Sequence, residues 1–181
     1  MNINIIREKI LEVKARRDFT EIQNYFETHP DGIELLVTVL INEEDYPLKE
    51  YSSWILVHLC KSHPNLVRPF YDQFVDLLFI SQDQTVLRNV VNIISHLKIK
   101  NYRESELIDV LISFIQEHRN KVALQVYSMQ ILALFVLKYP ELKKEIVEIL
   151  DLNDKDKTPA YNSGKRNFMK KTKKINLDLL N

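Results

Sequence analysis

The apolar residues of this chain recur in a fixed register, and no other feature of the sequence limits the fold as strongly. Pro64 and Pro140 lie 76 residues apart in two similar phrases, KSHPNL and LKYPEL, and a middle copy fits at half that shift, 38 residues. The apolar positions then match in all three copies, as in Ile55/Ile93/Ile131, Leu59/Leu97/Phe135 and Phe74/Ile112/Leu150. An earlier copy, with the phrase ETHPDG, fits from Pro30 at a shift of 34. The sequence therefore contains an internal repeat of the length that helical repeat arrays use.

Each repeat is predicted to be a pair of helices. Apolar residues recur at steps of three and four, which is the helical period, and proline marks helix boundaries because a helix tolerates it only in the first turn. Only Gly32 and Gly164 are glycines, which excludes phosphate-cradling loops and dinucleotide fingerprints. The expected fold is all-α, with a leading helix near 3–15 and helix pairs near 18–28 and 31–42, 47–62 and 65–80, 84–99 and 104–118, and 121–138 and 141–151.

The segments that open two of the second helices carry a family resemblance. HPNLVRPFYDQFVDLL at 63–78 and YPELKKEIVEIL at 139–150 resemble HEAT repeats of the small bacterial HEAT-like, armadillo-type proteins. The resemblance covers about residues 18–151 and implies an α-α superhelix, a HEAT-like solenoid of about four helical hairpins. It also implies a protein that holds partners, although a few relatives, the alkylpurine DNA glycosylases, are enzymes. The Arg or Asp ladder of eukaryotic HEAT repeats is not regularly present here, so no binding residues follow from the resemblance.

The C-terminal part of the chain differs in composition from the repeats. We expect a HEAT-like repeat domain over residues 1–152, a linker over 153–164 broken by Pro159 and Gly164, and a basic segment over 165–181. Ser163 is placed to cap a helix that begins at Lys165. This segment could cap the last repeat, bind nucleic acid or an anionic membrane, or lie along the acidic groove of the protein itself. The candidate phosphate-binding residues are Lys165, Arg166, Lys170, Lys171, Lys173 and Lys174.

Trp54 is the single tryptophan of the chain, and its repeat mates, Asn92 and Gln130, are polar. The alignment therefore predicts that Trp54 is exposed or lines a groove, although it could instead cover a repeat edge. Tyr51 lies three residues earlier on the same expected helix and would share its face. Exposed tryptophan and tyrosine side chains are good anchors for a partner. Tyr51 and Trp54 are the candidate aromatic contact.

The second helices of the repeats are rich in acidic residues. In HEAT-like proteins second helices typically line the concave side, so the resemblance implies an acidic groove, which would repel a phosphate backbone. The alternative is that these acids are simply solvated. The candidate partner-binding acids are Asp72, Asp76, Glu104, Asp109 and Glu145.

No pattern in the sequence predicts a catalytic, metal or cofactor site. Cys60 is the single cysteine; His58, two residues before it, points to a different side of a helix, so a nucleophile with an adjacent base is not expected. The histidines show no metal-ligand spacing. With no possible internal disulfide and no apolar run long enough to span a bilayer, we expect a cytoplasmic protein.

The sequence favours a non-enzymatic protein-interaction scaffold that binds a basic or mixed-charge helical segment of a partner protein on an acidic concave groove. The alternative is a HEAT-like protein that associates with nucleic acid through its basic C-terminal segment and is connected with DNA repair. The two functions differ in their response to salt. The affinity of a nucleic-acid-binding protein for its ligand would fall steeply as the salt concentration rises, whereas that of a protein scaffold would fall little.

Overall fold

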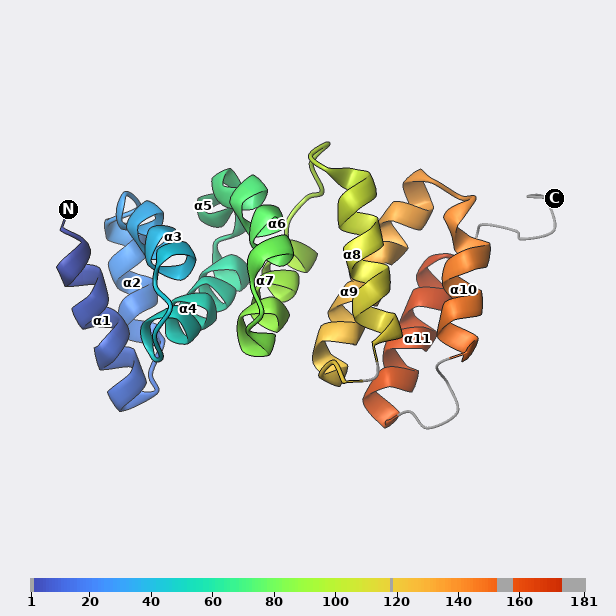
Figure 1. Ribbon diagram of the computed structural model, residues 1–181. Coiled ribbons are helices and arrows are strands. Elements are labelled where there is room, and N and C mark those ends of the chain that lie inside the picture. The colour runs from blue at the N-terminus through green and yellow to red at the C-terminus, as the bar shows by residue number, and fades with distance from the viewer. Residues whose placement is uncertain (1, 118, 153–157, 174–181) are drawn as a thin grey trace. The chain divides into compact units, whose positions relative to one another are not determined.

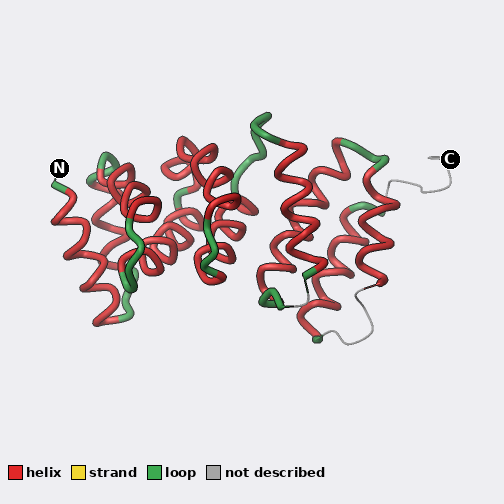
Figure 2. Tube along the Cα trace, in the orientation of Figure 1, coloured by secondary structure: helices red, strands yellow, loops and turns green. Residues whose placement is uncertain are grey.

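The computed structural model describes residues 2–117, 119–152 and 158–173. Within these residues the regular structure is helical, as expected, and short loops join the helices (Figures 1 and 2). The chain divides into two compact units, Met1–Lys100 and Asn101–Asn181.

The first unit is built around α4, the first helix of the second predicted pair. In this unit α1 packs against α3 and α4, α4 packs against α3 and α7, and α6 packs against α7. Ile55, Leu56 and Leu59 of α4 are completely buried, as their repeat register predicted. The helices of this unit are α1 (Ile3–Arg16), α2 (Thr20–Thr28), α3 (Gly32–Asn42), α4 (Leu48–Ser62), α5 (Pro64–Val67), α6 (Tyr71–Ile80) and α7 (Gln84–His96).

The second helix of the second pair is not continuous, contrary to the expected single helix over 65–80. Helix α5 ends at Val67, a short 3-10 turn, η1, covers Arg68–Phe70, and α6 begins at Tyr71. Pro69 lies within η1 and has no N–H to donate to a preceding carbonyl, so the α-helical ladder is interrupted here. Pro64, by contrast, starts α5 in the first turn, where proline is well tolerated.

The second unit is built around α9, a long helix with nonpolar residues on most of its circumference. Helix α9 packs against α8, α10 and α11, and Leu124, Ile131 and Leu132 have no exposed surface. The helices of this unit are α8 (Glu104–Gln116), α9 (Val122–Lys138), α10 (Leu142–Leu152) and α11 (Pro159–Lys171). The predicted third pair is thus divided, because α7 belongs to the first unit and α8 to the second.

Helix α11 corrects the boundaries expected for the C-terminal part. It begins at Pro159, with the Thr158 side chain accepting a hydrogen bond from the Tyr161 N–H, whereas the sequence had suggested a linker up to residue 164 and a helix from Lys165. Pro159 favours a helix start, and Gly164 lies inside the helix, where it faces α9. Part of the expected linker, residues 153–157, and the end of the basic segment, residues 174–181, lie outside the described residues.

Candidate interaction surface

A row of aromatic rings lies at the surface of the first unit. It consists of Tyr46, Tyr51, Trp54, Phe19 and His58, and we call it the aromatic row. The ring centroids are 6.3 Å apart for Tyr46 and Tyr51, 5.8 Å for Tyr51 and Trp54, 6.3 Å for Trp54 and Phe19, and 4.0 Å for Phe19 and His58. Tyr46 is 61% exposed and Trp54 is 39% exposed. Tyr46 and Trp54 are therefore open to solvent, whereas the Tyr51, Phe19 and His58 rings that continue the row are half-buried.

Three different elements place these rings side by side. Tyr51, Trp54 and His58 follow one another at steps of three and four on α4 and therefore share a face. Phe19 stands immediately before α2, and Tyr46 belongs to the loop before α4. The helical spacing of α4 alone supplies three of the five rings, and tertiary packing supplies the other two.

Two cations border the aromatic row. The Arg88 guanidinium lies 5.9 Å from the centre of the Trp54 ring, and the Lys14 ammonium lies 5.1 Å from that of Tyr46, both within the range of cation–π attraction. Burial, assisted by the charge of Lys61, lowers the pKa of His58. His58 therefore stacks on Phe19 as a neutral ring at physiological pH.

The prediction that Trp54 is accessible is confirmed, but the repeat alignment that suggested it is only partly valid. Its repeat mate Gln130 is exposed, whereas Asn92 is only 5% exposed. The same repeat position therefore does not have the same environment in every copy. Phe19 and Arg88 could not be predicted as members of this surface, because no sequence spacing relates them to α4, and Tyr46 lies in the loop before α4, outside its helical spacing.

The predicted acidic residues divide between the two units. Asp72 and Asp76 lie on α6 in the first, and Glu104, Asp109 and Glu145 lie on α8 and α10 in the second. Asp72 forms an ion pair with Lys100 at 2.6 Å, and Glu104 forms one with Lys138 at 2.8 Å. Counting charges along the second helices overestimated their acidity, because these lysines come from outside them.

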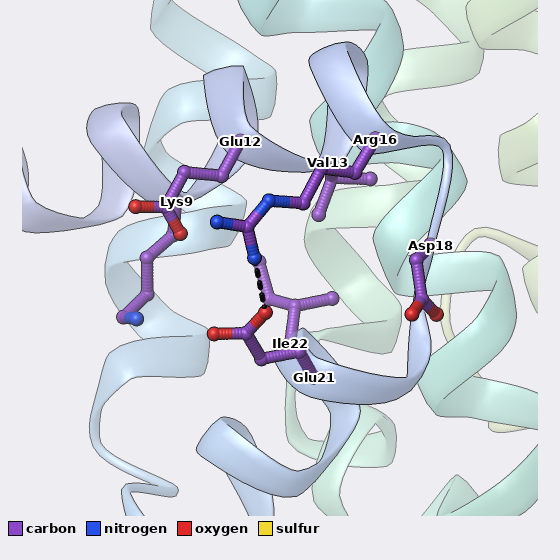
Figure 3. Close-up of a pocket in the computed structure, with 7 residues that line it drawn as sticks. All are labelled: Lys9, Glu12, Val13, Arg16, Asp18, Glu21 and Ile22. Carbon is purple, nitrogen blue, oxygen red and sulfur yellow. Dashed lines mark hydrogen bonds and ion pairs between the residues drawn. The ribbon is translucent and has the colours of Figure 1, made fainter.

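The hollow between α1 and α2 is too small for a substrate (Figure 3). Its volume is about 10 Å³, which is room for about one water molecule. Inside it, Arg16 and Glu21 form an ion pair at 2.8 Å. Hydrogen bonds from the Thr20 backbone and hydroxyl lower the pKa of Asp18, at the start of α2. These charges fix the turn between the two helices, and the lining residues are Lys9, Glu12, Val13, Arg16, Asp18, Glu21 and Ile22.

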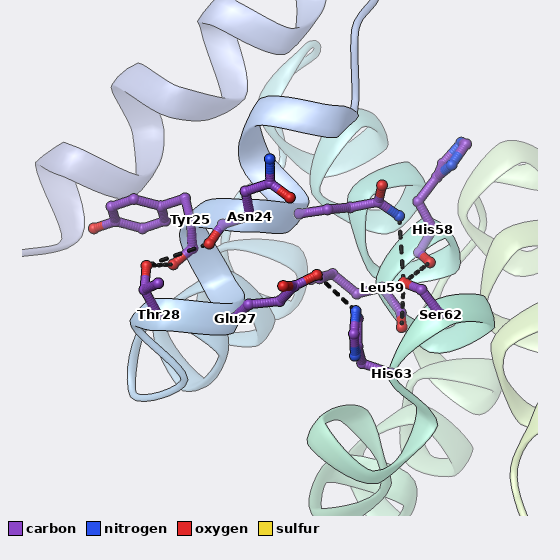
Figure 4. Close-up of polar contacts among 9 residues, drawn as sticks. Asn24, Tyr25, Glu27, Thr28, His58, Leu59, Ser62 and His63 are labelled. Atoms are coloured by element: carbon purple, nitrogen blue, oxygen red, sulfur yellow. Dashed lines mark hydrogen bonds and ion pairs between the residues drawn. The ribbon is translucent and has the colours of Figure 1, made fainter.

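Polar contacts also join α2 to the C-terminal end of α4 (Figure 4). The His63 Nε2 lies 2.8 Å from a Glu27 carboxylate oxygen, and the Gln23 side-chain amide donates to the Ser62 hydroxyl at 3.4 Å. His63 follows the last residue of α4, and its N–H bonds the Leu59 carbonyl. His63 is therefore a residue of the turn between α4 and α5.

Cys60 is buried in the first unit. Burial raises the pKa of its thiol to about 12. The thiol donates a hydrogen bond to the Ile93 carbonyl oxygen, 3.6 Å from the Sγ. Within residues 2–117, 119–152 and 158–173, no three His, Cys, Asp or Glu side chains are grouped so that they could hold a metal ion. None of the described helices has the length and nonpolar composition needed to cross a membrane.

The basic residues of the C-terminal segment have different environments. Lys165 forms an ion pair with Asp151 at 2.8 Å and is mostly buried. Arg166, Lys170, Lys171 and Lys173 are exposed, and Lys174 lies outside the described residues.

Comparison with known protein families identifies the repeat. A family model described as HEAT repeat domain matches residues 6–172, which include the leading helix and α11 as well as the predicted hairpins. Searches of the curated proteins and of the solved structures found no match. HEAT repeats are helical scaffolds that commonly mediate protein interactions. The resemblance of the sequence to HEAT repeats is therefore confirmed, and the chain belongs to the HEAT repeat family.

Proposed function

We propose that this protein is a non-enzymatic scaffold that holds a segment of a partner protein on the aromatic row of its first unit. The observation that carries the proposal is the unbroken series of ring contacts, in which Tyr46 and Trp54 are exposed. Aromatic side chains, with tryptophan and tyrosine foremost, contribute most of the binding energy at many protein interfaces. A surface of this kind on a helical repeat unit is suited to a protein ligand.

The aromatic row is also organised in advance of binding. The Trp54 ring contacts Phe19 on one side and Tyr51 on the other, and Arg88 lies over its face. These contacts restrict the ring before a partner arrives, so less side-chain entropy is lost when the complex forms.

The chemistry of the surface defines the partner segment. Nonpolar or aromatic anchor side chains would pack on the rings, and carboxylates at the edge of the segment would meet Lys14 and Arg88. The acidic residues of the second helices remain a separate predicted contact for basic side chains of a partner protein. Of these, Asp109 and Glu145 are exposed.

The test is a comparison of tagged full-length variants in nuclease-treated native lysate. Tyr51→Ser/Trp54→Ser removes the centre of the aromatic row, and Ile80→Ser/Leu137→Ser is the control, since both of its residues are at least as exposed as Trp54. We expect a stoichiometric protein that the wild type and the control retain and the first variant loses, with a weakening of at least about tenfold in affinity for the purified partner. Equal retention by both variants would show that the aromatic row is not the contact. Because Trp54 is the only tryptophan, its fluorescence reports directly on occupancy of this surface.

A further inference from the structure

Helix α11 has two chemically distinct faces. Tyr161, Gly164, Phe168 and Thr172 are all buried, and the contact of α11 with α9 is visible in Figure 1. Away from this buried side the helix carries exposed Arg166, Lys170 and Lys171, and the exposed Lys173 follows the helix end. We call these four cations the basic face.

The buried side of α11 covers α9 closely. An added side-chain carbon at Gly164 would lie only 3.0 Å from Val126 Cγ2 and 3.2 Å from Met129 Sδ, so the absence of a side chain allows the two helices to approach each other. Helix α11 thus caps the end of the second unit, as repeat arrays require. An amphipathic helix binds a membrane by inserting its nonpolar face, and here that face is already buried.

Two cations of the basic face share one side of the helix. Arg166 and Lys170 are four residues apart on α11, a spacing that places them on the same side, while Lys171 lies at the helix end and Lys173 follows it. No Asp or Glu occurs between residues 158 and 173. Among the residues that the structure describes, none of the four cations forms an ion pair. The charge of this surface is therefore available to a ligand.

The surroundings of the basic face favour a nucleic acid over an acidic peptide. Asn162, Lys165, Arg166 and Met169 form an open surface beside it, and Met169 is 39% exposed. A nucleic-acid strand combines phosphates with nonpolar sugar and base surfaces that an exposed methionine can contact, and an amide can donate to phosphate or sugar oxygens.

The distribution of charge between the units supports the same ligand. Residues 101–181 contain 14 Lys and Arg against 11 Asp and Glu, whereas residues 1–100 contain 11 against 14. The excess of the second unit comes from residues 153–181, which contain 8 Lys and Arg against 3 Asp and Glu, so a polyanion is attracted to this segment.

We propose that the basic face of α11 binds the phosphate backbone of a nucleic acid, with Met169 and Asn162 in contact with the strand. This site lies in the second unit, whereas the proposed protein contact lies in the first, so each can fail without the other. The ligand contacts are sequence-independent, because phosphate contacts position a nucleic acid without reading its bases.

The experiment measures fluorescence anisotropy of a labelled DNA duplex of about 20 base pairs and of the matching single strand, with full-length protein at about 50 to 200 mM salt. If all four cations contact phosphates, the slope of log K against log salt is about −3.6 for the duplex and about −2.8 for the single strand. The preferred form of nucleic acid is the one bound more tightly.

Matched variants separate this face from general charge. Arg166→Ser/Lys170→Ser/Lys173→Ser should bring the slope to about −1 and reduce affinity at low salt at least about tenfold. The control, Lys61→Ser/Lys98→Ser/Lys144→Ser, removes the same charge from exposed positions elsewhere and should leave the slope unchanged. Arg166→Lys/Lys170→Arg/Lys173→Arg keeps the charge and should also keep the slope. Met169→Ser should weaken binding at an unchanged slope, because it removes a nonpolar contact.

Several results would overturn the proposal. These are the absence of binding at about 50 mM salt, an equal loss in the control variant, or tighter binding of a glutamate-rich peptide or of phosphatidylserine vesicles than of either DNA. If the three-serine variant loses its helical circular dichroism, the comparison rests on the charge-keeping variant and on Met169→Ser. The proposal would be contradicted by a changed salt slope in the charge-keeping variant. It would also be contradicted by an unchanged affinity of Met169→Ser for DNA.

Discussion

Cys60 illustrates how burial determines the chemistry of a single residue. Its thiol is 1% exposed on α4, and burial raises its pKa from 9.0 to about 12. The thiolate is the reactive form of cysteine, so this residue serves as a small nonpolar side chain in the core.

We predict that Cys60 reacts with Ellman's reagent only when the first unit opens. A rise in pKa from 9.0 to about 12 reduces the thiolate fraction at pH 8 by a factor of the order of 1000, and burial blocks access as well. Absorbance at neutral to mildly alkaline pH should show labelling at a small fraction of the rate measured in denaturant. Rapid labelling of the folded protein would contradict the burial of this side chain.

Gly164 shows that a residue can have a different role from the one its type suggests. From the sequence, Gly164 is expected to break a helix, yet it lies inside α11 and faces Val126 and Met129 of α9. Glycine costs helix stability, and here it allows two helices to pack at short distance.

The packing at Gly164 predicts a large effect from a larger side chain. Gly164→Leu should reduce the free energy of unfolding by about 1–3 kcal/mol, because the added atoms overlap Val126 and Met129. The control is Ser163→Leu at the exposed neighbouring position, which should change stability by no more than about 0.5 kcal/mol. Urea unfolding followed by circular dichroism measures both, and equal effects would contradict the close approach of the helices.

At the scale of elements, a polar cluster joins the start of α8 to the end of α9. Glu104 accepts hydrogen bonds from the Lys138 ammonium at 2.8 Å and from the Tyr139 hydroxyl at 2.6 Å. Burial tends to raise the pKa of Glu104, but these hydrogen bonds and the charge of Lys138 outweigh it, so the pKa lies below its ordinary value of 4.5. The carboxylate is therefore stabilised in the folded protein.

This cluster predicts how stability depends on pH. A lowered pKa means that the unfolded chain binds more protons, so the contribution of Glu104 is complete above about pH 5 and is lost as the pH falls through the pKa in the folded protein. Glu104→Gln should cost about 1 kcal/mol near pH 7 and progressively less in acid. Urea midpoints from pH 7 to pH 3 test this, with Glu141→Gln at an exposed position as the control. A stability difference between the wild type and Glu104→Gln that is the same at all pH values would contradict this role of Glu104.

At the scale of the whole molecule, the terminal helix of the second unit contributes buried aromatic side chains to its core. In the second unit that helix is α11, whose Tyr161 and Phe168 side chains are at most 2% exposed. The Tyr161 hydroxyl also donates to the Leu150 carbonyl of α10 at 3.5 Å. Without α11, the side of α9 that it covers would face water.

Removal of α11 should therefore destabilise the second unit. A chain that ends at Leu152 should lose about 3–6 kcal/mol, counted as about 1.5–3 kcal/mol for each of the two buried aromatic side chains, and should bind a hydrophobic dye. A chain that ends at Lys173 keeps α11 and is the control. Thermal unfolding of both chains measures the difference, and equal stability would mean that α11 is not a structural cap.

The elements were predictable from the sequence to a large extent. Helical periodicity and the prolines at 64 and 140 located the helix pairs, because both act through the local backbone. The interruption at Pro69 and the early start of α11 at Pro159 were missed. In both cases the sequence contained the proline, but the nonpolar pattern continued past Pro69 and indicated a helix start at Lys165.

The sequence by itself determined that this protein is all-α and built from HEAT-like hairpins, since the helical period and the repeat register are properties of neighbouring residues. Only the tertiary structure decided which distant residues meet. It brought Phe19 and Arg88 to Trp54, divided the chain between α7 and α8, and placed Gly164 against α9. The physical reason is that local periodicity fixes which side of a helix is nonpolar, whereas the packing of whole helices fixes which side chains share a surface.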